Sequence, residues 1–241
     1  FDKTFIADSY SCRVGKGTHR AMNRFRSFSR KVSKNHTRTC FVLKCDIKKF
    51  FASIDHEALA KILRRYIADP DILWLLNQVI SSFSSANNIP TYSSLLVCSK
   101  GLPLGNLTSQ LLVNVYMNEF DQFIKHKLKA KHYIRYADDF VILSHKKQEL
   151  EQSLLYIKAF LCEKLNLTLH PNKVFIKTFA SGVDFLGWVH FPDHRVLRTS
   201  TKRRMFRRIA EMEGNEETID SYLGLLSHGN AQKLRRVVVM Y

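Results

Sequence analysis

The chain has 241 residues, 45% of them hydrophobic, which suits one large globular domain or a domain with a small appendage. Lys and Arg number 38 against 21 Asp and Glu, a net charge of +17, and such an excess favours polyanionic partners. No run approaches the roughly 18 apolar residues of a membrane span and no signal-peptide pattern opens the chain, so we expect no membrane association.

The ends of the chain and its cysteines give two further expectations. The chain begins at Phe1 rather than Met and ends in an apolar run at Tyr241, so we expect a fragment of a longer polypeptide. The cysteines are odd in number and form no CxxC pair, which favours neither a disulfide framework nor a zinc ribbon and predicts a reducing, cytoplasmic compartment. His190 and His194 have an HxxxH spacing, but no cysteine pair precedes them to favour zinc.

Positive charge is concentrated in two tracts. No acidic residue lies between Ser9 and Cys45 or between Arg195 and Arg208, whereas basic residues recur through both segments. Two separated tracts could hold a nucleic-acid backbone from two sides. A generally basic surface or a membrane-surface helix is the alternative, but the length of the tracts and their lack of acidic partners favour nucleic acid.

The first 105 residues predict loops, one strand and three helices. Residues 1–39 are loop-rich with a helix from about Thr18, and the apolar, β-branched run from Thr39 to Ile47 predicts a buried strand. Apolar residues at helical spacing after Asp55 predict a second helix, and Asp69-Pro70 starts a third that reaches about Ile80. The polar stretch 81–100 predicts a connecting loop or short hairpin, and 101–105 a turn.

The rest of the chain predicts an antiparallel sheet backed by helices. In chain order we expect a helix at about 108–130, a hairpin around 132–143, a helix at about 147–165, strands at 172–179 and 183–191, and two or three helices from Thr201, broken near Gly214 and Gly229. From residue 40 to 190 this order is close to a βαββαβ unit. The predicted fold class is therefore α+β with a ferredoxin-like sheet.

Two adjacent carboxylates stand in the predicted hairpin, within Tyr136-Ala137-Asp138-Asp139. Like charges this close are unfavourable unless a cation or solvent separates them, so the turn is either a magnesium site or a solvated Asp-Asp turn. Asp46 ends the first buried strand, which a ferredoxin-like sheet places beside the hairpin. Together these carboxylates could hold two magnesium ions about 3.5–4 Å apart for phosphoryl transfer, although Asp46 could instead be a strand-end turn or helix cap.

Five segments, in order, resemble the motifs of reverse transcriptases, and the resemblance covers nearly the whole chain. Cys45–Phe51 is similar to the motif with the first metal-binding aspartate, and Tyr136–Asp139 to the YxDD box. Leu102–Gln110 is similar to the motif behind the incoming nucleotide and template. Leu167–Lys173 is similar to the motif with a lysine near the triphosphate, and Phe185–Trp188 to the primer-grip hairpin. The resemblance implies a right-hand polymerase palm at 40–194 with a fingers insertion around 56–104, partial fingers at 1–39 and a partial helical thumb at 195–241.

The resemblance also implies a centre for RNA-directed DNA synthesis. Asp46, Asp138 and Asp139 would bind the metal with help from the carbonyl of Ile47. The cofactor would be two Mg²⁺ ions, with Mn²⁺ as a substitute. Lys173 would neutralise or protonate the departing pyrophosphate, although a solvated turn lysine is the alternative.

Nucleotide selection is implied by two of the resembling motifs. Phe51 lies five residues after Asp46, where such enzymes carry an aromatic gate against the ribose 2′-hydroxyl, and core packing is the alternative. Leu104, Gly105 and Gln110 would line the nucleotide pocket. Their LGxxxSQ pattern is similar to that of diversity-generating retroelements, and Leu104 cannot make the hydrogen bonds of the more usual Gln, so low fidelity is expected. The alanine of the YxDD-like box is more frequent in group II intron and retron relatives.

The resemblance finally implies nucleic-acid partners. These would be template RNA and a primer or cDNA, with dNTPs as substrates and a structured RNA and a basic accessory protein as further partners. The fingers of such enzymes begin upstream of the segment at Ser9, so this chain is expected to lack part of them. An intron-type or phage-defence enzyme and a non-catalytic RNA-binding scaffold are the alternatives. The expected primer and template contacts are Arg13, Lys16, Tyr136, Phe185, Leu186, Gly187, Trp188, Lys202, Arg203, Arg207 and Arg208.

Overall fold

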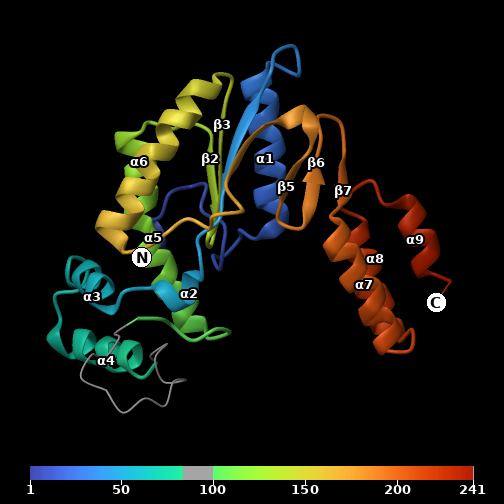
Figure 1. The fold of residues 1–241 in the computed structure, drawn as a ribbon. Helices are drawn as coiled ribbons and strands as arrows, with labels where there is room; N and C mark the ends of the chain where they lie inside the picture. Colours follow the sequence, from blue (N-terminus) through green and yellow to red (C-terminus); the bar gives the residue numbers. More distant parts are fainter. Residues whose placement is uncertain (84–99, 241) are drawn as a thin grey trace.

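A four-stranded antiparallel sheet organises the larger part of the molecule, in a computed structural model that describes residues 1–83 and 100–240 (Figure 1). The strand order is β2-β3-β1-β4, as in a ferredoxin-like sheet. The strands are β1 (Phe41–Cys45), β2 (Tyr133–Tyr136), β3 (Asp139–Ser144) and β4 (Phe175–Thr178). The prediction that the first strand lies beside the hairpin is confirmed, since β1 pairs with β3 from Phe41 to Cys45.

Helices cover both faces of this sheet. Leu43 and Ile142 point into the core that includes α5 (Leu107–Gln122) and α6 (Lys147–Leu165). Their neighbours in the strands point the other way, into a second core against α1 (Thr18–Ser33). The long helix expected at about 108–130 is therefore present, and a π-helical turn, η2 (Phe123–Lys127), continues it beyond Gln122.

Three helices follow the carboxyl end of β1: α2 (Phe50–Ser53), α3 (His56–Arg64) and α4 (Pro70–Ser81). The predicted start signals are confirmed, because the side chains of Asp55 and Asp69 accept hydrogen bonds from the first turns of α3 and α4. The loop or hairpin expected at 81–100 lies mostly outside the described residues. The segment that follows returns to α2, where the Leu102 amide donates to the Phe51 carbonyl (2.9 Å).

A second sheet corrects one sequence prediction. A single strand is expected across 183–191, but the structure forms a hairpin of β5 (Val183–Phe185) and β6 (Trp188–His190), extended by β7 (Arg195–Leu197). The strand breaks because Leu186 and Gly187 have φ values of +54° and +82°, which suit a two-residue hairpin turn. β7 belongs to this sheet, and the helical tail, which is expected from Thr201, begins at Thr199.

Three helices form the tail, as the breaks near Gly214 and Gly229 predict: α7 (Thr199–Glu211), α8 (Glu216–Leu226) and α9 (Gln232–Val238). They pack on the second sheet through a small core of their own, which includes Trp188, Met205, Ile209 and Leu226. In Figure 1 these helices stand apart from α2, α3 and α4, with the four-stranded sheet above and between the two groups.

The remaining short elements are the 3-10 turns η1 (Asp2–Thr4) and η3 (Phe179–Ser181). Four cysteines in the described part of the chain, Cys12, Cys40, Cys45 and Cys162, are free thiols, and Cys98 lies outside it. Within residues 1–83 and 100–240 no helix has both the length and the apolarity to cross a membrane.

Candidate active site

The acidic pair lies at a two-residue turn between β2 and β3. Tyr136 pairs with Asp139, which leaves Ala137 and Asp138 as the turn. Ala137 has φ +54°, an uncommon value for a residue with a side chain. Its carbonyl accepts a hydrogen bond from Nη1 of Arg135 (3.0 Å), so the turn is held in place by a buried guanidinium.

That guanidinium belongs to a buried charge network that the sequence does not reveal. Arg135 is fully buried and makes two bonds to Asp121 of α5, Nε–Oδ1 at 2.8 Å and Nη2–Oδ2 at 2.7 Å. The Tyr133 hydroxyl donates to the same carboxylate (2.6 Å), and Ser9 and Asn114 accept further bonds from Arg135. The only sequence signal is a charge inside an apolar strand. We infer that this network positions the turn.

Asp46 comes to the same end of the sheet. Cys45, the last residue of β1, pairs with Phe140, so the next residue along β1 stands level with Asp139. Burial raises the pKa of the Asp138 carboxyl, the neighbouring Asp46 carboxylate raises it further, and Lys173 opposes the shift. Two carboxylates from different strands therefore converge, as the sequence predicts, in an arrangement that favours a bound cation.

Asp139 is placed differently from its two neighbours. Its Oδ2 lies 3.3 Å from Nζ of Lys44 on the adjacent strand, and its Oδ1 is buried without a hydrogen-bond partner. Burial raises the pKa of Asp139 to about 7, with Lys44 acting in the opposite direction. Asp139 thus faces Lys44 within the sheet, as Asp46 faces Lys173.

The segment 167–173 lies against the residues that follow β1. The His170 amide donates to the Asp46 carbonyl (2.8 Å) and the Lys48 amide to the Thr168 carbonyl (2.9 Å), while Ile47 bridges to Leu169. The carbonyl of Ile47 takes part in neither of these two bonds. Lys173 is brought onto Asp46, with its Nζ 3.3 and 3.2 Å from the two carboxylate oxygens.

The expected metal ligands are carboxylates, which suit a divalent cation, and two of them, Asp46 and Asp139, are paired with lysines. In the part of the chain that the structure describes, no three His, Cys, Asp or Glu side chains gather closely enough to hold a metal. Of the three expected carboxylates, Asp139 lies against Lys44, whereas Asp46 and Asp138 stand beside each other. The carboxylates of Asp46 and Asp138 are hard oxygen donors of the kind that Mg²⁺ prefers. The ammonium of Lys173 lies 3.2 Å from Oδ2 of Asp46.

The expected nucleotide-pocket residues lie on two segments. The Phe51 ring is partly buried and packs edge-on against Phe50, with ring centroids 5.5 Å apart. Leu104 is 78% exposed, and Gly105 follows it in a turn with φ +80°. Gln110 accepts a hydrogen bond from Sγ of Cys12 (2.9 Å), so its amide is tied to the segment before α1.

Several expected primer and template contacts have internal partners. Arg13 binds Asp2 (2.6 Å) and the carbonyls of Ile6 and Ser9, so its charge stabilises the N-terminal segment. Lys16 donates to the Ala7 carbonyl (2.8 Å). The Tyr136 hydroxyl accepts a hydrogen bond from Thr18 (3.3 Å).

The hairpin expected as a primer grip has a buried base. Phe185 and Trp188 pair across it and are 0% and 1% exposed, because each packs in a hydrophobic core. Only the turn, Leu186 and Gly187, lies at the tip of the hairpin. The basic residues Lys202, Arg203, Arg207 and Arg208 are all exposed on α7, and Glu211 pairs with the last two (3.6 Å each).

Comparison with solved structures supports the fold. Telomerase from Candida albicans, solved with a fragment of telomeric RNA, superposes with a TM-score of 0.61 at 12% identity, over 100% of this chain and 45% of that one. Truncated apo telomerase from Candida tropicalis gives a TM-score of 0.59 at 12% identity, over 79% and 41%. The chain therefore has a palm-like α+β fold of the kind found in reverse transcriptases.

Comparison of sequences supplies the family. Residues 2–190 match the family model described as reverse transcriptase (RNA-dependent DNA polymerase), and the chain belongs to that family. Protein YkfC of Escherichia coli is 26% identical over 84% of this chain and 58% of that protein. The group II intron-encoded protein LtrA of Lactococcus lactis is 25% identical over 66% and 35%. The chain thus spans 58% of the length of YkfC and 35% of the length of LtrA.

Proposed function

We propose that this chain is the catalytic part of an RNA-directed DNA polymerase, which copies a template RNA into cDNA. The observation that carries the proposal is the convergence of Asp46 and Asp138 at one end of the sheet, in a chain of the reverse transcriptase family. Template RNA, a primer and dNTPs are the proposed partners, and the net charge of +17 suits all three.

The proposed chemistry is nucleotidyl transfer. Bound at Asp46 and Asp138, two Mg²⁺ ions, or Mn²⁺ in their place, would activate the primer hydroxyl and neutralise the developing charge. The primer 3′ oxygen attacks the α-phosphorus of the dNTP, the bond from that phosphorus to the pyrophosphate oxygen breaks, and the hydroxyl proton leaves to solvent. Lys173, already beside Asp46, is proposed to transfer a proton to the departing pyrophosphate.

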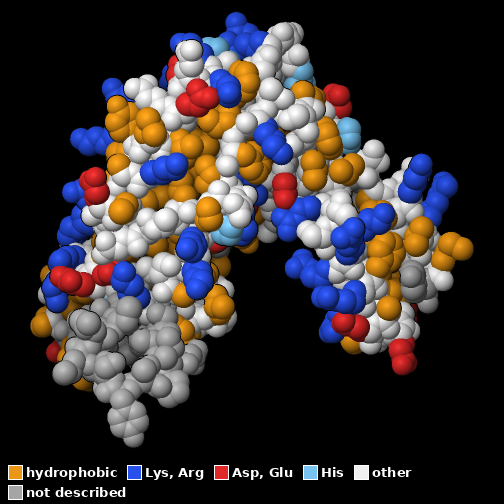
Figure 2. All heavy atoms as spheres, viewed as in Figure 1, with side chains coloured by type: hydrophobic (Ala, Val, Ile, Leu, Met, Phe, Trp, Pro, Cys, Tyr) orange, Lys and Arg blue, Asp and Glu red, His pale blue; other side chains and the backbone are white. Residues whose placement is uncertain are grey.

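The larger organisation follows as part of the proposal. Residues 1–39 with 56–104 would supply fingers, and α7 to α9 a thumb. Figure 2 shows a wide opening between the lobe with α2, α3 and α4 and the lobe with α7, α8 and α9, and Lys and Arg side chains line the α7 side of it. The exposed charges of α7, including Lys202 and Arg203, would contact the duplex backbone in a salt-dependent way without reading sequence.

Phe51 is proposed to select the sugar. Its ring projects from α2, the helix that follows Asp46 and Ile47, and is anchored by packing on Phe50. A Phe51→Val variant would open space for a ribose 2′-hydroxyl, so rNTP incorporation should rise about tenfold or more relative to dNTP. Unchanged sugar preference would assign Phe51 to packing alone.

A finer proposal is error-prone copying of the diversity-generating type. Leu104 offers no hydrogen bond where a more faithful pocket would carry a glutamine, and its side chain is exposed and free to be replaced. Leu104→Gln should lower misincorporation opposite template adenines. The similarity to LtrA, a group II intron-encoded protein, favours a second candidate, an intron-type enzyme, for which the wild type would already copy adenines faithfully.

The direct test uses the complete protein with a DNA primer on an RNA template, dNTPs and Mg²⁺. Extension of the primer supports the proposal. Binding of the RNA without any incorporation would support a non-catalytic RNA-binding scaffold instead.

A further inference from the structure

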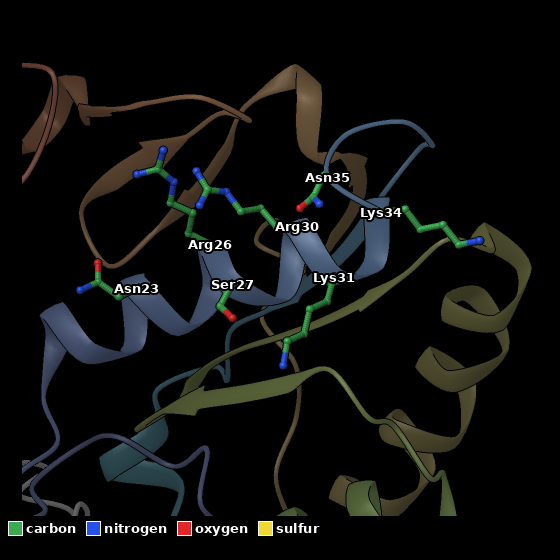
Figure 3. Close-up of a pocket in the computed structure, with 7 residues that line it drawn as sticks. All are labelled: Asn23, Arg26, Ser27, Arg30, Lys31, Lys34 and Asn35. Carbon is green, nitrogen blue, oxygen red and sulfur yellow. The ribbon is translucent and has the colours of Figure 1, made fainter.

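The outer face of α1 carries positive charge that the proposed polymerase site does not use. One face of α1 buries apolar side chains such as Phe25 and Phe28 against the sheet, and the opposite face is polar. A hollow of about 560 Å³ runs along that face (Figure 3). Its lining consists of Asn23, Arg26, Ser27, Arg30, Lys31, Lys34 and Asn35, which are four cations, three hydrogen-bonding side chains and no carboxylate.

None of these four cations belongs to an ion pair among the described residues. In residues 1–83 and 100–240, Arg30, Lys31 and Lys34 form no ion pair, whereas Arg24 on the same helix is paired with Asp8 (2.8 Å). Arg26 donates Nη2 to the Asp193 carbonyl (2.8 Å), and its Nε is buried without a hydrogen-bond partner. Burial lowers the pKa of Arg195, and the positive charge of Arg26 lowers that pKa further.

The spacing of the charges suits a linear polyanion. Arg26 and Arg30 lie one turn apart on α1, and Lys34 follows as the C-cap of the helix, in a left-handed conformation with φ +50°, so the three charges are spread along about 12 Å. In Figure 3 the side chains of Arg26 and Arg30 extend to the same side of the helix. Such a row can contact successive phosphates of one strand.

The chemistry of the lining favours nucleic acid over a membrane surface. A membrane-bound helix needs exposed apolar side chains at its edge, and the lining contains none. Asn23, Ser27 and Asn35 instead offer hydrogen bonds to phosphate and sugar oxygens. No aromatic ring is available in the lining to stack on a base, so the backbone rather than the sequence would be recognised.

The hollow is separate from the proposed active site. The N-terminal end of α1 touches the catalytic hairpin through Thr18 and Tyr136, and the helix runs from there toward the opposite end of the sheet (Figure 1). We propose that the outer face of α1 binds the phosphodiester backbone of a nucleic-acid segment that lies outside the polymerisation site. It would hold a distant part of a long template or a structured RNA while the primer end is extended.

The test compares two variants of the complete protein. Arg30→Gln, Lys31→Gln and Lys34→Gln together remove three unpaired charges from α1. Lys127→Gln, Lys158→Gln and Lys164→Gln remove three exposed charges from η2 and α6, on the other face of the sheet. The α1 variant should bind a long RNA hairpin at least about tenfold more weakly, with a log–log salt slope about two to three units shallower, and the control variant should bind as the wild type does.

Two further arms separate this surface from the polymerase site. A primer annealed to a template too short to reach α1 should bind equally to all three proteins, whether or not it is extended. A DNA hairpin in place of the RNA hairpin distinguishes shared backbone recognition from contacts to the 2′-hydroxyl. The proposal would be overturned if the α1 and control variants lost affinity for the RNA hairpin to the same extent. It would also be overturned if the α1 variant lost as much affinity for the short primer–template as for the hairpin.

Discussion

The ammonium of Lys173 lies 3.2 Å from Oδ2 of Asp46 and 3.3 Å from Oδ1, so it straddles the carboxylate that follows β1. This contact crosses 127 residues of sequence and is made possible by the backbone bonds between 46–48 and 168–170. A divalent cation bound at the same carboxylate would repel the ammonium. We therefore expect Lys173 to move from Asp46 toward the triphosphate when metal binds.

Replacing Lys173 should have opposite effects on metal affinity and rate. In Lys173→Met the carboxylate of Asp46 loses its competing cation, so the Mg²⁺ concentration at half-maximal activity should fall a few-fold. The maximal rate should fall about a hundredfold, because a proton donor to pyrophosphate is lost. Steady-state extension over a Mg²⁺ titration measures both quantities. The exposed Lys164→Met is the control, and a Lys173→Met enzyme with unchanged rate would remove Lys173 from the chemistry.

The buried pair of Arg135 and Asp121 should dominate the stability of the hairpin. Arg135→Met leaves the Asp121 carboxylate buried without its partner and should lower the free energy of unfolding by about 3–5 kcal/mol. Replacing both residues, Arg135→Met with Asp121→Leu, should cost less than either single change. Denaturant unfolding measures these values. A double variant as unstable as the sum of the singles would contradict the coupling.

These two contacts also mark what the sequence could and could not predict. The sequence predicts Asp46 beside the hairpin because the first strand of a ferredoxin-like sheet runs next to the hairpin strands, and β1 does pair with β3. The Arg135–Asp121 pair could not be predicted, since each charge is read as solvent-exposed until the helix and strand are packed. Phe185 and Trp188 were expected at a nucleic-acid surface, but their burial depends on α1 and α7, which no local pattern reveals.

His190 should make the fold sensitive to acid. Burial lowers the pKa of His190 to about 4, although its hydrogen bond to the Phe185 carbonyl opposes the shift. Between about pH 6.5 and 4 the unfolded chain binds a proton that the folded chain does not, so stability falls as the pH falls. From pH 7 to pH 5 the loss should be about 2 kcal/mol.

The His190→Gln variant isolates this contribution. Its unfolding free energy should change less between pH 7 and pH 5 than that of the wild type, because glutamine does not titrate. His126→Gln, at an exposed position on η2, is the control and should keep the wild-type pH dependence. An identical pH dependence in all three proteins would show that His190 is not the group that titrates.

Two glycines of the helical tail should respond in opposite ways to alanine. A Cβ at Gly229 would collide with the ring of Trp188, so Gly229→Ala should loosen α9 from the second sheet. Gly224, within α8, has open space where a Cβ would project, and Gly224→Ala should stabilise the helix by about 1 kcal/mol. Thermal unfolding and limited proteolysis of the tail measure both. Equal stability of the two variants would contradict the packing of Gly229 on Trp188.

The most direct test of the central claim is incorporation of a single dNTP by the complete protein on an RNA template, comparing the wild type with Asp138→Asn. We predict that the wild type incorporates the nucleotide in a Mg²⁺-dependent reaction. The variant, folded to the same thermal stability or better because a buried charge is gone, should be slower by about a thousandfold or more. An Asp138→Asn enzyme that incorporates dNTP at the wild-type rate would contradict the assignment of Asp46 and Asp138 as the catalytic pair.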